Sequence, residues 1–364
     1  MIYATRGDRN GAAKWVREMQ SAGFTLPVVV YTSLIAAHAK AGDPAEARKV
    51  FDALQSSGEN LSSETNAIAF TSLLNAYAAQ GDVGKALRVL AQMTDSGVQP
   101  NTVTYTSLVN AHVRAGDLPG AWKVVDRMRK HGAEPNAHTF TTLLSAHAKA
   151  GQVKEAWGVL DTMAEAGTKA NVVTYNCLLQ AHVRSGDVAG AARVLGKMED
   201  AGISNDPVTF RNLISLCLKA GDIPGARAAI ADMREMGFTP RLDMYNRILQ
   251  YVVRKNRDVE EGERMLQEMR EARYLTLDAV TYSIVIGGHV ARGDKEAVVR
   301  LMNEMFDSEV SPDSMTWSIV EKAVGKEERE RLQKVCSSKG IRWHPSRKQK
   351  QKQRAKAKAR KFRN

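Results

Sequence analysis

Short polar side chains recur at two fixed positions, once in every stretch of about 35 residues. The first position follows an aromatic residue and holds Thr32, Thr71, Thr106, Thr141, Asn176, Arg211, Asn246 and Ser283. The second closes each stretch and holds Asn66, Asn101, Asn136, Asn171, Asp206, Arg241, Asp278 and Asp313. Hydroxyl, amide and carboxylate groups donate or accept hydrogen bonds, so two such columns could recognise successive units of a polymer. The same residue types are favoured as helix caps. Capping explains their size, but not why Thr accompanies Asn in four stretches and Asn accompanies Asp in two.

Cationic side chains occupy a third fixed position. They stand shortly before a recurrent glycine, or at the equivalent place, and comprise Lys40, Arg114, Lys149, Arg184, Lys219 and Arg254. If the stretches stack on one another, these cations align along one face. A solvated helix end, where cations favour the helix dipole, is the alternative interpretation.

The elements that must position these columns are repeats. Residues 102–136 read TVTYTSLVNAHVRAGDLPGAWKVVDRMRKHGAEPN, and residues 172–206 read VVTYNCLLQAHVRSGDVAGAARVLGKMEDAGISND. The frames are 28–66, 67–101, 102–136, 137–171, 172–206, 207–241, 242–278 and 279–313. Self-similarity at this period predicts a solenoid, in which each repeat packs on its neighbours. The first repeat has extra residues in a polar stretch at 58–66, and the seventh has two extra residues and lacks the glycine.

Each repeat is predicted to be a pair of helices. In the third repeat, apolar residues recur three and four apart from Tyr105 onward, which is helical spacing with one buried stripe. The first helix would end at Gly116, whose backbone would adopt the left-handed conformation with positive φ, and Asp117 would cap the second helix. Pro119 fits the first turn of that helix. Gly132 would end it, and no segment shows the alternation of a strand.

Four regions follow from these frames. Residues 1–27 form a partial first repeat, since Gly7-Asp8 and Met19 match later copies. Residues 28–313 contain eight full repeats, and 314–346 form a degenerate C-terminal repeat. Residues 347–364 are a basic arm that we expect to be disordered, because like charges in a run repel and bury no core. The chain begins inside a repeat, so a truncated start or a processed mature form is expected.

The charge is concentrated in that arm. The chain has 52 Lys and Arg against 40 Asp and Glu, a net charge of +12. The arm contributes ten cations and no acid, which leaves the remainder close to neutral. Its cations are Arg347, Lys348, Lys350, Lys352, Arg354, Lys356, Lys358, Arg360, Lys361 and Arg363. A run without acids favours phosphate binding through counterion release, and a solvated tail is the alternative.

Two other columns are predicted to be structural. The histidines His38, His112, His147, His182 and His289 share one repeat position, which Tyr77 and Cys217 fill elsewhere. This exchange indicates packing between repeats rather than a metal site, whose ligands are usually closely spaced. The aromatic column Tyr31, Phe70, Tyr105, Phe140, Tyr175, Phe210, Tyr245, Tyr282 and Trp317 is expected in the core. The three cysteines, Cys177, Cys217 and Cys336, are expected to be reduced, and no stretch is apolar enough to span a membrane.

Together these features resemble one known family. Tyr-x-x-Leu, Gly-Asp, Ala, Met, Gly and a terminal Pro-Asn or Pro-Asp at a period of 35 are similar to the plain type of pentatricopeptide repeat. The resemblance covers roughly residues 1–340. The 34-residue tetratricopeptide pattern fits worse, because the period differs and its Trp-x-x-Leu-Gly signature is absent. The resemblance implies an all-α, right-handed superhelical α-solenoid and sequence-specific binding of single-stranded RNA in an organelle.

The resemblance also implies roles for the columns. The two polar columns would read one base per repeat, since unstacked bases expose their Watson–Crick edges. Thr with Asn would select adenine, Asn with Asp uracil, and Ser or Thr with Asp guanine. The cationic column would approach the RNA backbone. Apolar residues three positions before the first column would wedge between bases, namely Val29, Ile68, Val103, Val173, Val208 and Val280. Arg211 with Arg241 fits no code, and the length changes weaken the assignments of Asn66 and Asp278.

Enzymatic functions are not supported by the sequence. It lacks an HxE motif followed by PCxxC, an acidic metal-nuclease domain and a Walker loop. We therefore expect an RNA-binding adaptor without cofactor or metal that acts on organellar mRNA or rRNA, with the chloroplast preferred over the mitochondrion. No membrane or DNA partner is expected. A structural component of an organellar ribosome is one alternative, favoured by the arm, and a protein–protein scaffold is another.

Overall fold

The computed structural model describes residues 27–57, 62–272 and 274–341. The arm at 347–364 and the partial repeat before residue 27 therefore lie outside the described residues. Those described form two compact bodies, and the chain divides between them at Ser204 and Asn205. Every regular element in them is an α-helix, as the repeat period predicts. None of these helices has the length and apolar character needed to cross a membrane.

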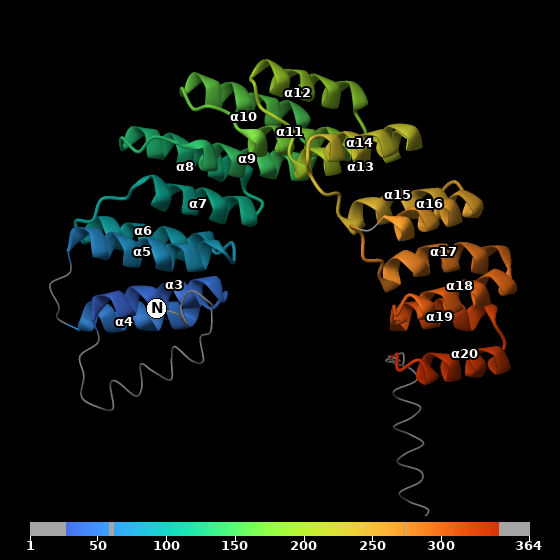
Figure 1. The fold of residues 1–364 in the computed structure, drawn as a ribbon. Coiled ribbons are helices and arrows are strands. Elements are labelled where there is room, and N and C mark those ends of the chain that lie inside the picture. The colour runs from blue at the N-terminus through green and yellow to red at the C-terminus, as the bar shows by residue number, and fades with distance from the viewer. Residues whose placement is uncertain (1–26, 58–61, 273, 342–364) are drawn as a thin grey trace, which may run out of the picture. The chain divides into compact units, whose positions relative to one another are not determined.

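The N-terminal body consists of five helix pairs stacked in chain order (Figure 1). Its helices are α3 (Val28–Lys40), α4 (Pro44–Ser56), α5 (Ser63–Ala78), α6 (Val83–Asp95), α7 (Thr102–Arg114), α8 (Leu118–Lys130), α9 (Ala137–Ala150), α10 (Val153–Glu165), α11 (Val172–Ser185) and α12 (Val188–Asp200). Each odd-numbered helix opens a repeat and packs on the odd-numbered helix of the next repeat. We call α3, α5, α7, α9 and α11 the first-helix row of this body.

The C-terminal body repeats the arrangement with four pairs. Its helices are α13 (Pro207–Ala220), α14 (Ile223–Glu235), α15 (Leu242–Arg254), α16 (Val259–Glu271), α17 (Ala279–Arg292), α18 (Lys295–Asp307), α19 (Ser314–Ala323) and α20 (Lys326–Ser338). Its first-helix row is α13, α15, α17 and α19. The degenerate last repeat thus also forms a helix pair.

The turn inside each repeat follows the Gly-Asp signature. Gly116 adopts φ 77°, a conformation that costs glycine little and other residues more. The Asp117 carboxylate then caps α8, because its Oδ1 accepts the Gly120 backbone N–H at 2.9 Å. In the seventh repeat, which lacks the glycine, Arg257 takes the left-handed conformation with φ 58°. That repeat also carries one extra residue in each of its two loops.

The structure differs from the expected frame at the start of the second repeat. We expected Asn66 to close the first repeat ahead of a new helix. Instead α5 begins at Ser63, with the Ser62 hydroxyl accepting the Thr65 backbone N–H at 3.2 Å. Asn66 therefore lies one turn inside α5, where its side-chain oxygen accepts a hydrogen bond from Gln55 at 3.2 Å. A local serine cap, four residues early, has taken over the start of the helix.

The aromatic column is the centre of the core, as predicted. All of its members are buried except Tyr245, which is half-buried. The Tyr245 hydroxyl lies 2.7 Å from the Tyr274 hydroxyl, in the loop that carries an extra residue. Burial, followed by the Tyr274 hydrogen bond, raises the pKa of Tyr245 well above its ordinary value. The loop with the extra residue thus supplies a polar partner for Tyr245, as Ser308 does for Tyr282 in the next repeat, where the two hydroxyl oxygens lie 2.9 Å apart.

Candidate nucleic-acid interface

The apolar residues predicted to wedge between bases are exposed. Val29, Ile68, Val103, Val173, Val208 and Val280 have 37–58% of their surface accessible. Five of them lie in the first turn of a first helix, and Ile68 lies in the second turn of α5 because that helix begins early, so they form one exposed apolar line in each body. His138 and Asp243 occupy this position in the other two repeats. Exposed aliphatic side chains aligned in this way are typical of a contact surface rather than of a solvated face.

The structure adds one member to this line. Met315 in α19 is 62% exposed and stands two residues before Trp317, as Val103 stands two residues before Tyr105. Sequence reasoning missed it because the last repeat was treated as a degenerate cap. The signal was present, since the distance to the aromatic residue is the same.

The two polar columns are brought together by a third column that sequence reasoning missed. In the third repeat, Thr106 Oγ1 lies 2.7 Å from Thr139 Oγ1, and the Thr139 hydroxyl lies 3.1 Å from Asn136 Oδ1. Thr139 belongs to the next repeat and is fully buried. It therefore bridges the two side chains that were predicted to read one base.

The same bridge recurs in three other repeats. Thr104 connects Thr71 with Asn101 at 3.0 and 3.1 Å. In the C-terminal body, Thr281 connects Asn246 with Asp278 at 2.9 and 2.9 Å. Thr316 likewise connects Ser283 with Asp313 at 2.7 and 2.8 Å. The pairing of columns deduced from the sequence thus corresponds to a physical linkage in these repeats.

The second column also caps the next first helix. The side-chain oxygens of Asn101, Asn136 and Asn171 accept the backbone N–H three residues later at 3.0–3.1 Å. Asp206, Asp278 and Asp313 do the same at 2.7–2.9 Å. The capping alternative is therefore correct for these six residues, and the linkage to the first column accompanies it. Arg241 makes no side-chain cap.

Capping fixes which polar atom each residue presents outward. An N-cap must turn an oxygen toward the helix N–H groups. An asparagine in this position therefore points its amide NH2 away from the helix, whereas an aspartate points a second acceptor oxygen away. Asn101, Asn136 and Asn171 are exposed. The first column is more enclosed, with Thr106 keeping 6% of its surface accessible.

Two repeats lack the bridge because the third column changes. Opposite Thr32 stands the buried Ala69, and the Thr32 hydroxyl instead bonds the Val29 carbonyl in its own helix at 3.1 Å. Opposite Arg211 stands the buried Met244. The fourth repeat differs from these two because its third column keeps a threonine, Thr174. There the Thr141 hydroxyl donates to the Ala137 carbonyl of its own helix at 2.6 Å.

The cationic column is exposed at the ends of the first helices. Lys40, Arg114, Lys149, Arg184, Lys219 and Arg254 all have high surface exposure. The arginines of the N-terminal body also link repeats: Arg114 Nη1 donates to the Ala79 carbonyl at 2.9 Å. Arg184 Nη1 donates in the same way to the Lys149 carbonyl at 3.0 Å. These guanidinium groups satisfy carbonyls at the end of the preceding first helix.

The sequence comparison agrees with this geometry. The chain matches the family described as the pentacotripeptide-repeat region of PRORP over residues 35–189, 120–222 and 161–329. The chain belongs to the pentatricopeptide repeat family. A comparison with curated proteins finds no match.

Solved structures of pentatricopeptide repeat proteins share the fold. The maize protein PPR10 is similar with a TM-score of 0.72 and 22% identity, over 90% of this chain and 45% of that chain. PPR10 in complex with an 18-nt psaJ RNA element is similar with a TM-score of 0.64 and 22% identity, over 90% of this chain and 47% of that chain. The chain spans about half the length of these proteins.

In these pentatricopeptide repeats, His147 and His182 of the histidine column join neighbouring repeats, which is the packing role predicted for the column. His147 Nε2 accepts the Trp122 indole N–H at 3.3 Å, and His182 Nε2 accepts that of Trp157 at 3.0 Å. The other ring nitrogen of His182 lies 2.9 Å from Asp187, the cap of α12. Among the residues that the structure describes, no cluster of His, Cys, Asp and Glu is arranged to hold a metal.

The cysteines belong to the packing. Cys177 and Cys217 are half-buried and Cys336 is buried, and all three are free thiols. Burial raises the pKa of each thiol above its ordinary value. Raised pKa values disfavour the thiolate and hence nucleophilic chemistry.

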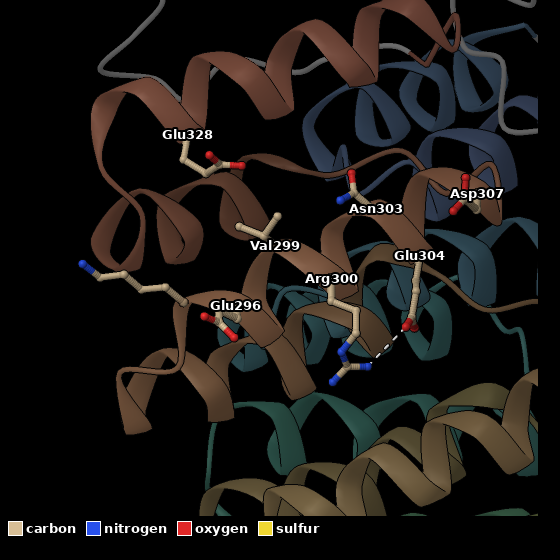
Figure 2. Close-up of a pocket in the computed structure, with 8 residues that line it drawn as sticks. Glu296, Val299, Arg300, Asn303, Glu304, Asp307 and Glu328 are labelled. Atoms are coloured by element: carbon tan, nitrogen blue, oxygen red, sulfur yellow. Dashed lines mark hydrogen bonds and ion pairs between the residues drawn. The ribbon is translucent and has the colours of Figure 1, made fainter.

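An open groove between α18 and α20 lies apart from the polar columns. Its lining includes Glu296, Arg300, Glu304 and Glu328 (Figure 2). Arg300 pairs with Glu304 at 3.2 Å and with Glu263 of the preceding repeat at 2.5 Å. Arg300 thus pairs with glutamates of two second helices, α16 and α18. The lining of the groove includes no member of the polar or apolar columns.

Proposed function

We propose that this chain is a sequence-selective single-stranded RNA-binding protein that reads one base per repeat along its first-helix rows. The observation that carries the proposal is the threonine bridge, which joins a first-column side chain to a second-column side chain in a fixed geometry. Membership of the pentatricopeptide repeat family supports RNA as the ligand, and PPR10 has been solved with a bound RNA element.

The orientation of the caps supplies a chemical basis for base selection. An asparagine such as Asn136 turns a donor outward, which complements adenine N1, an acceptor. An aspartate such as Asp313 turns an acceptor outward, which complements the imino N–H of uracil or guanine. A single cap position can therefore separate two classes of base by donor and acceptor pattern.

The apolar line supplies a place for each base. Val103 and its equivalents project from the N-terminal part of six first helices, near the second polar column. Single-stranded bases bury their faces against flat or aliphatic side chains, a contact that every base can make. The exposed cations at the other end of the same helices favour the phosphate backbone, which carries no sequence information.

The predicted target is 5′-N-AAAU-N-U-G-3′, read in parallel orientation from the repeat 28–66 to the repeat 279–313. The first base is left open because Asn66, its second-column residue, lies inside α5. Selection of bound RNA from a random pool by the full chain tests it. Enrichment of A at the third position and U at the fifth is expected. Failure to retain any RNA overturns the proposal in favour of a protein–protein scaffold, and equal binding of all sequences overturns base reading.

The location and biological role are further parts of the proposal. We propose an organellar adaptor for mRNA or rRNA, in the chloroplast rather than the mitochondrion, that acts by binding and not by catalysis. The basic arm favours a second candidate, a structural rRNA-binding component of an organellar ribosome. Co-sedimentation with ribosomal subunits at about 0.5 M salt, roughly three times the physiological ionic strength, separates a stable subunit from a transient adaptor.

A further inference from the structure

The sixth repeat, residues 207–241, keeps Val208 of the apolar line but lacks both polar columns and the threonine bridge. Arg211 and Arg241 replace the two polar columns, and the opposing residue Met244 has no hydroxyl to bridge them. Asp243 stands where the next apolar residue of the line would be, and it pairs with Arg241 at 3.2 Å. A base at this repeat would contact Val208 on one side only.

Cations occupy the place of the missing features. Arg211 is half-buried on α13, and no carboxylate lies within ion-pair distance of its guanidinium in the described part of the chain. Arg247 of α15 reaches across the repeat boundary, where its Nη1 donates to Ser215 Oγ at 2.5 Å. Ser215 follows Arg211 by one helical turn and bonds its carbonyl at 2.8 Å.

Arg211 and the guanidinium of Arg247 therefore belong to one short stripe of the first-helix row, the helical turn of α13 from Arg211 to Ser215. Helical spacing continues the stripe to Lys219, two turns beyond Arg211, and to Arg254, two turns beyond Arg247. Arg247, like Arg211, has no carboxylate partner among the residues described. The planar fork of a guanidinium matches two oxygens of a phosphodiester, and several such groups together favour an anion over a neutral base edge.

We propose that the sixth repeat is a phosphate-binding site, formed by Arg211 and Arg247, that carries one nucleotide of the bound RNA without reading its base. The inference rests on the proposed RNA-binding function and refines it. The target is then bipartite, with four read positions on the repeats from 67 to 206, one position held by its backbone, and two further read positions on the repeats 242–278 and 279–313.

Base removal along the target tests the proposal. Full-length chain is titrated with 5′-AAAAUAUG-3′ carrying a single abasic ribose at the third or the sixth nucleotide. Removal at the third position should weaken binding by about fivefold or more, because a stacked base contributes on the order of 1–3 kcal/mol. Removal at the sixth should change affinity by less than about twofold. Equal losses at both positions overturn the proposal while leaving RNA binding intact, whereas no binding of the parent RNA overturns the proposed function instead.

A neutral backbone linkage provides the complementary measurement. A methylphosphonate beside the sixth nucleotide should weaken binding by about five- to tenfold in the natural chain and lower its salt slope by about 0.7. In Arg211→Gln with Arg247→Gln the same linkage should have no further effect. Arg129→Gln, which removes an exposed cation from α8, is the matched control and should respond to the linkage like the natural chain. An undiminished linkage effect in the double variant overturns the assignment of these two arginines. So does an absent linkage effect in the natural chain, which needs no variant to fold.

Free phosphate is distinguished by competition. Inorganic phosphate at about 10 mM should displace little RNA, since a single anion gains none of the neighbouring base contacts, and only the general screening by salt is expected. Displacement well beyond that of chloride at equal ionic strength would identify a site for free anions and overturn the assignment to the RNA backbone.

Discussion

Thr106 and Thr139 place their hydroxyl oxygens 2.7 Å apart across the boundary between two repeats. The Thr106 hydroxyl also lies 2.7 Å from the Thr102 carbonyl, and the Thr139 hydroxyl lies 3.1 Å from Asn136 Oδ1. Three hydrogen-bond distances thus share two hydroxyl protons, because each threonine donates once. Which hydroxyl donates to which acceptor depends on the strength of the acceptors at the two ends of this hydrogen-bond series. A change of the cap residue therefore alters whether the Thr106 hydroxyl donates or accepts.

Removal of the bridge should weaken base selection without unfolding the chain. Thr139→Val keeps the shape of the buried side chain and removes its hydroxyl. We expect a loss of stability of about 1 kcal/mol, as for one buried hydrogen bond. The ratio of affinities for A and U at the third nucleotide should fall at least several-fold. Competition binding measures the ratio, with Thr162→Val as control, since that hydroxyl bonds only its own helix at Gly158. An unchanged ratio would make the bridge purely structural.

Exchange of both polar residues should change the preferred base. Thr106→Asn with Asn136→Asp reproduces the fifth repeat and should move the preference at the third nucleotide from A toward U. Each mismatch should cost about 1–3 kcal/mol. The Asp cap is expected to hold the helix as well as Asn does, because both rank among the best N-caps. Parallel titrations with A or U at the third and fourth nucleotides provide the internal control. If A remains preferred at the third while binding stays tight, the code does not apply to this chain.

The repeat frames and the core could be predicted from the sequence because local signals determine them. Gly116 and Asp117 end one helix and begin the next by backbone conformation and capping, which depend on a few neighbouring residues. Aromatic side chains at a constant period are predicted to pack because no other burial is available to them. The resemblance to pentatricopeptide repeats, and not the period alone, led to the expectation that Val103 contacts bases, and its exposure agrees with that expectation.

The contacts between repeats could not be predicted in this way. Thr139 reads in the sequence as an ordinary residue of the first helical turn, and its bond to Thr106 exists only after the repeats stack. The same holds for Arg114, whose carbonyl partner is 35 residues earlier. Asn66 was misplaced because a period assigns residues by counting, whereas the helix begins where Ser62 and Thr65 form a cap.

The acid dependence of stability should follow the caps of the second helices. The backbone N–H of Gly190, followed by the His182 ring, lowers the pKa of Asp187 below its ordinary value. A lowered pKa in the folded state stabilises the fold above the unfolded value of about 3.9. That stabilisation is lost as the pH falls through the folded value. Asp187→Asn can still cap but does not ionise. From about pH 5 to 7, which lies above the unfolded pKa of about 3.9, the melting temperature of this variant should therefore be lower than that of the natural chain. At about pH 3 the two melting temperatures should approach each other. A constant difference across this range would contradict the assignment.

The basic arm, residues 347–364, lies outside the described residues, and its role stays a prediction. Its deletion should weaken RNA binding about equally for all sequences, because interactions with phosphates are insensitive to the bases. The dependence of affinity on salt should flatten by about 0.7 to 1 unit for each phosphate that the shortened chain no longer neutralises. Fluorescence anisotropy with the predicted target and a scrambled RNA at several salt concentrations measures both effects. Unchanged affinity and slope would leave the arm as a solvated tail.

Variants of Lys149 and Arg184 should distinguish a role in binding the RNA backbone from a role in linking neighbouring repeats. Both are exposed at the ends of first helices, but Arg184 also donates to the Lys149 carbonyl at 3.0 Å. Lys149→Ala removes only a surface side chain and should shift stability by less than about 0.5 kcal/mol. Arg184→Ala leaves that carbonyl to solvent and should cost about 0.5–1.5 kcal/mol more. Each variant should weaken RNA binding without altering the preferred bases. Thermal melting and titration with the predicted target, compared with the exposed cation variant Lys154→Ala on α10 as control, measure the two effects. Full affinity in both variants would show that the cationic column only terminates helices, and a large loss of stability in Lys149→Ala would show that its face is packed and not open to RNA.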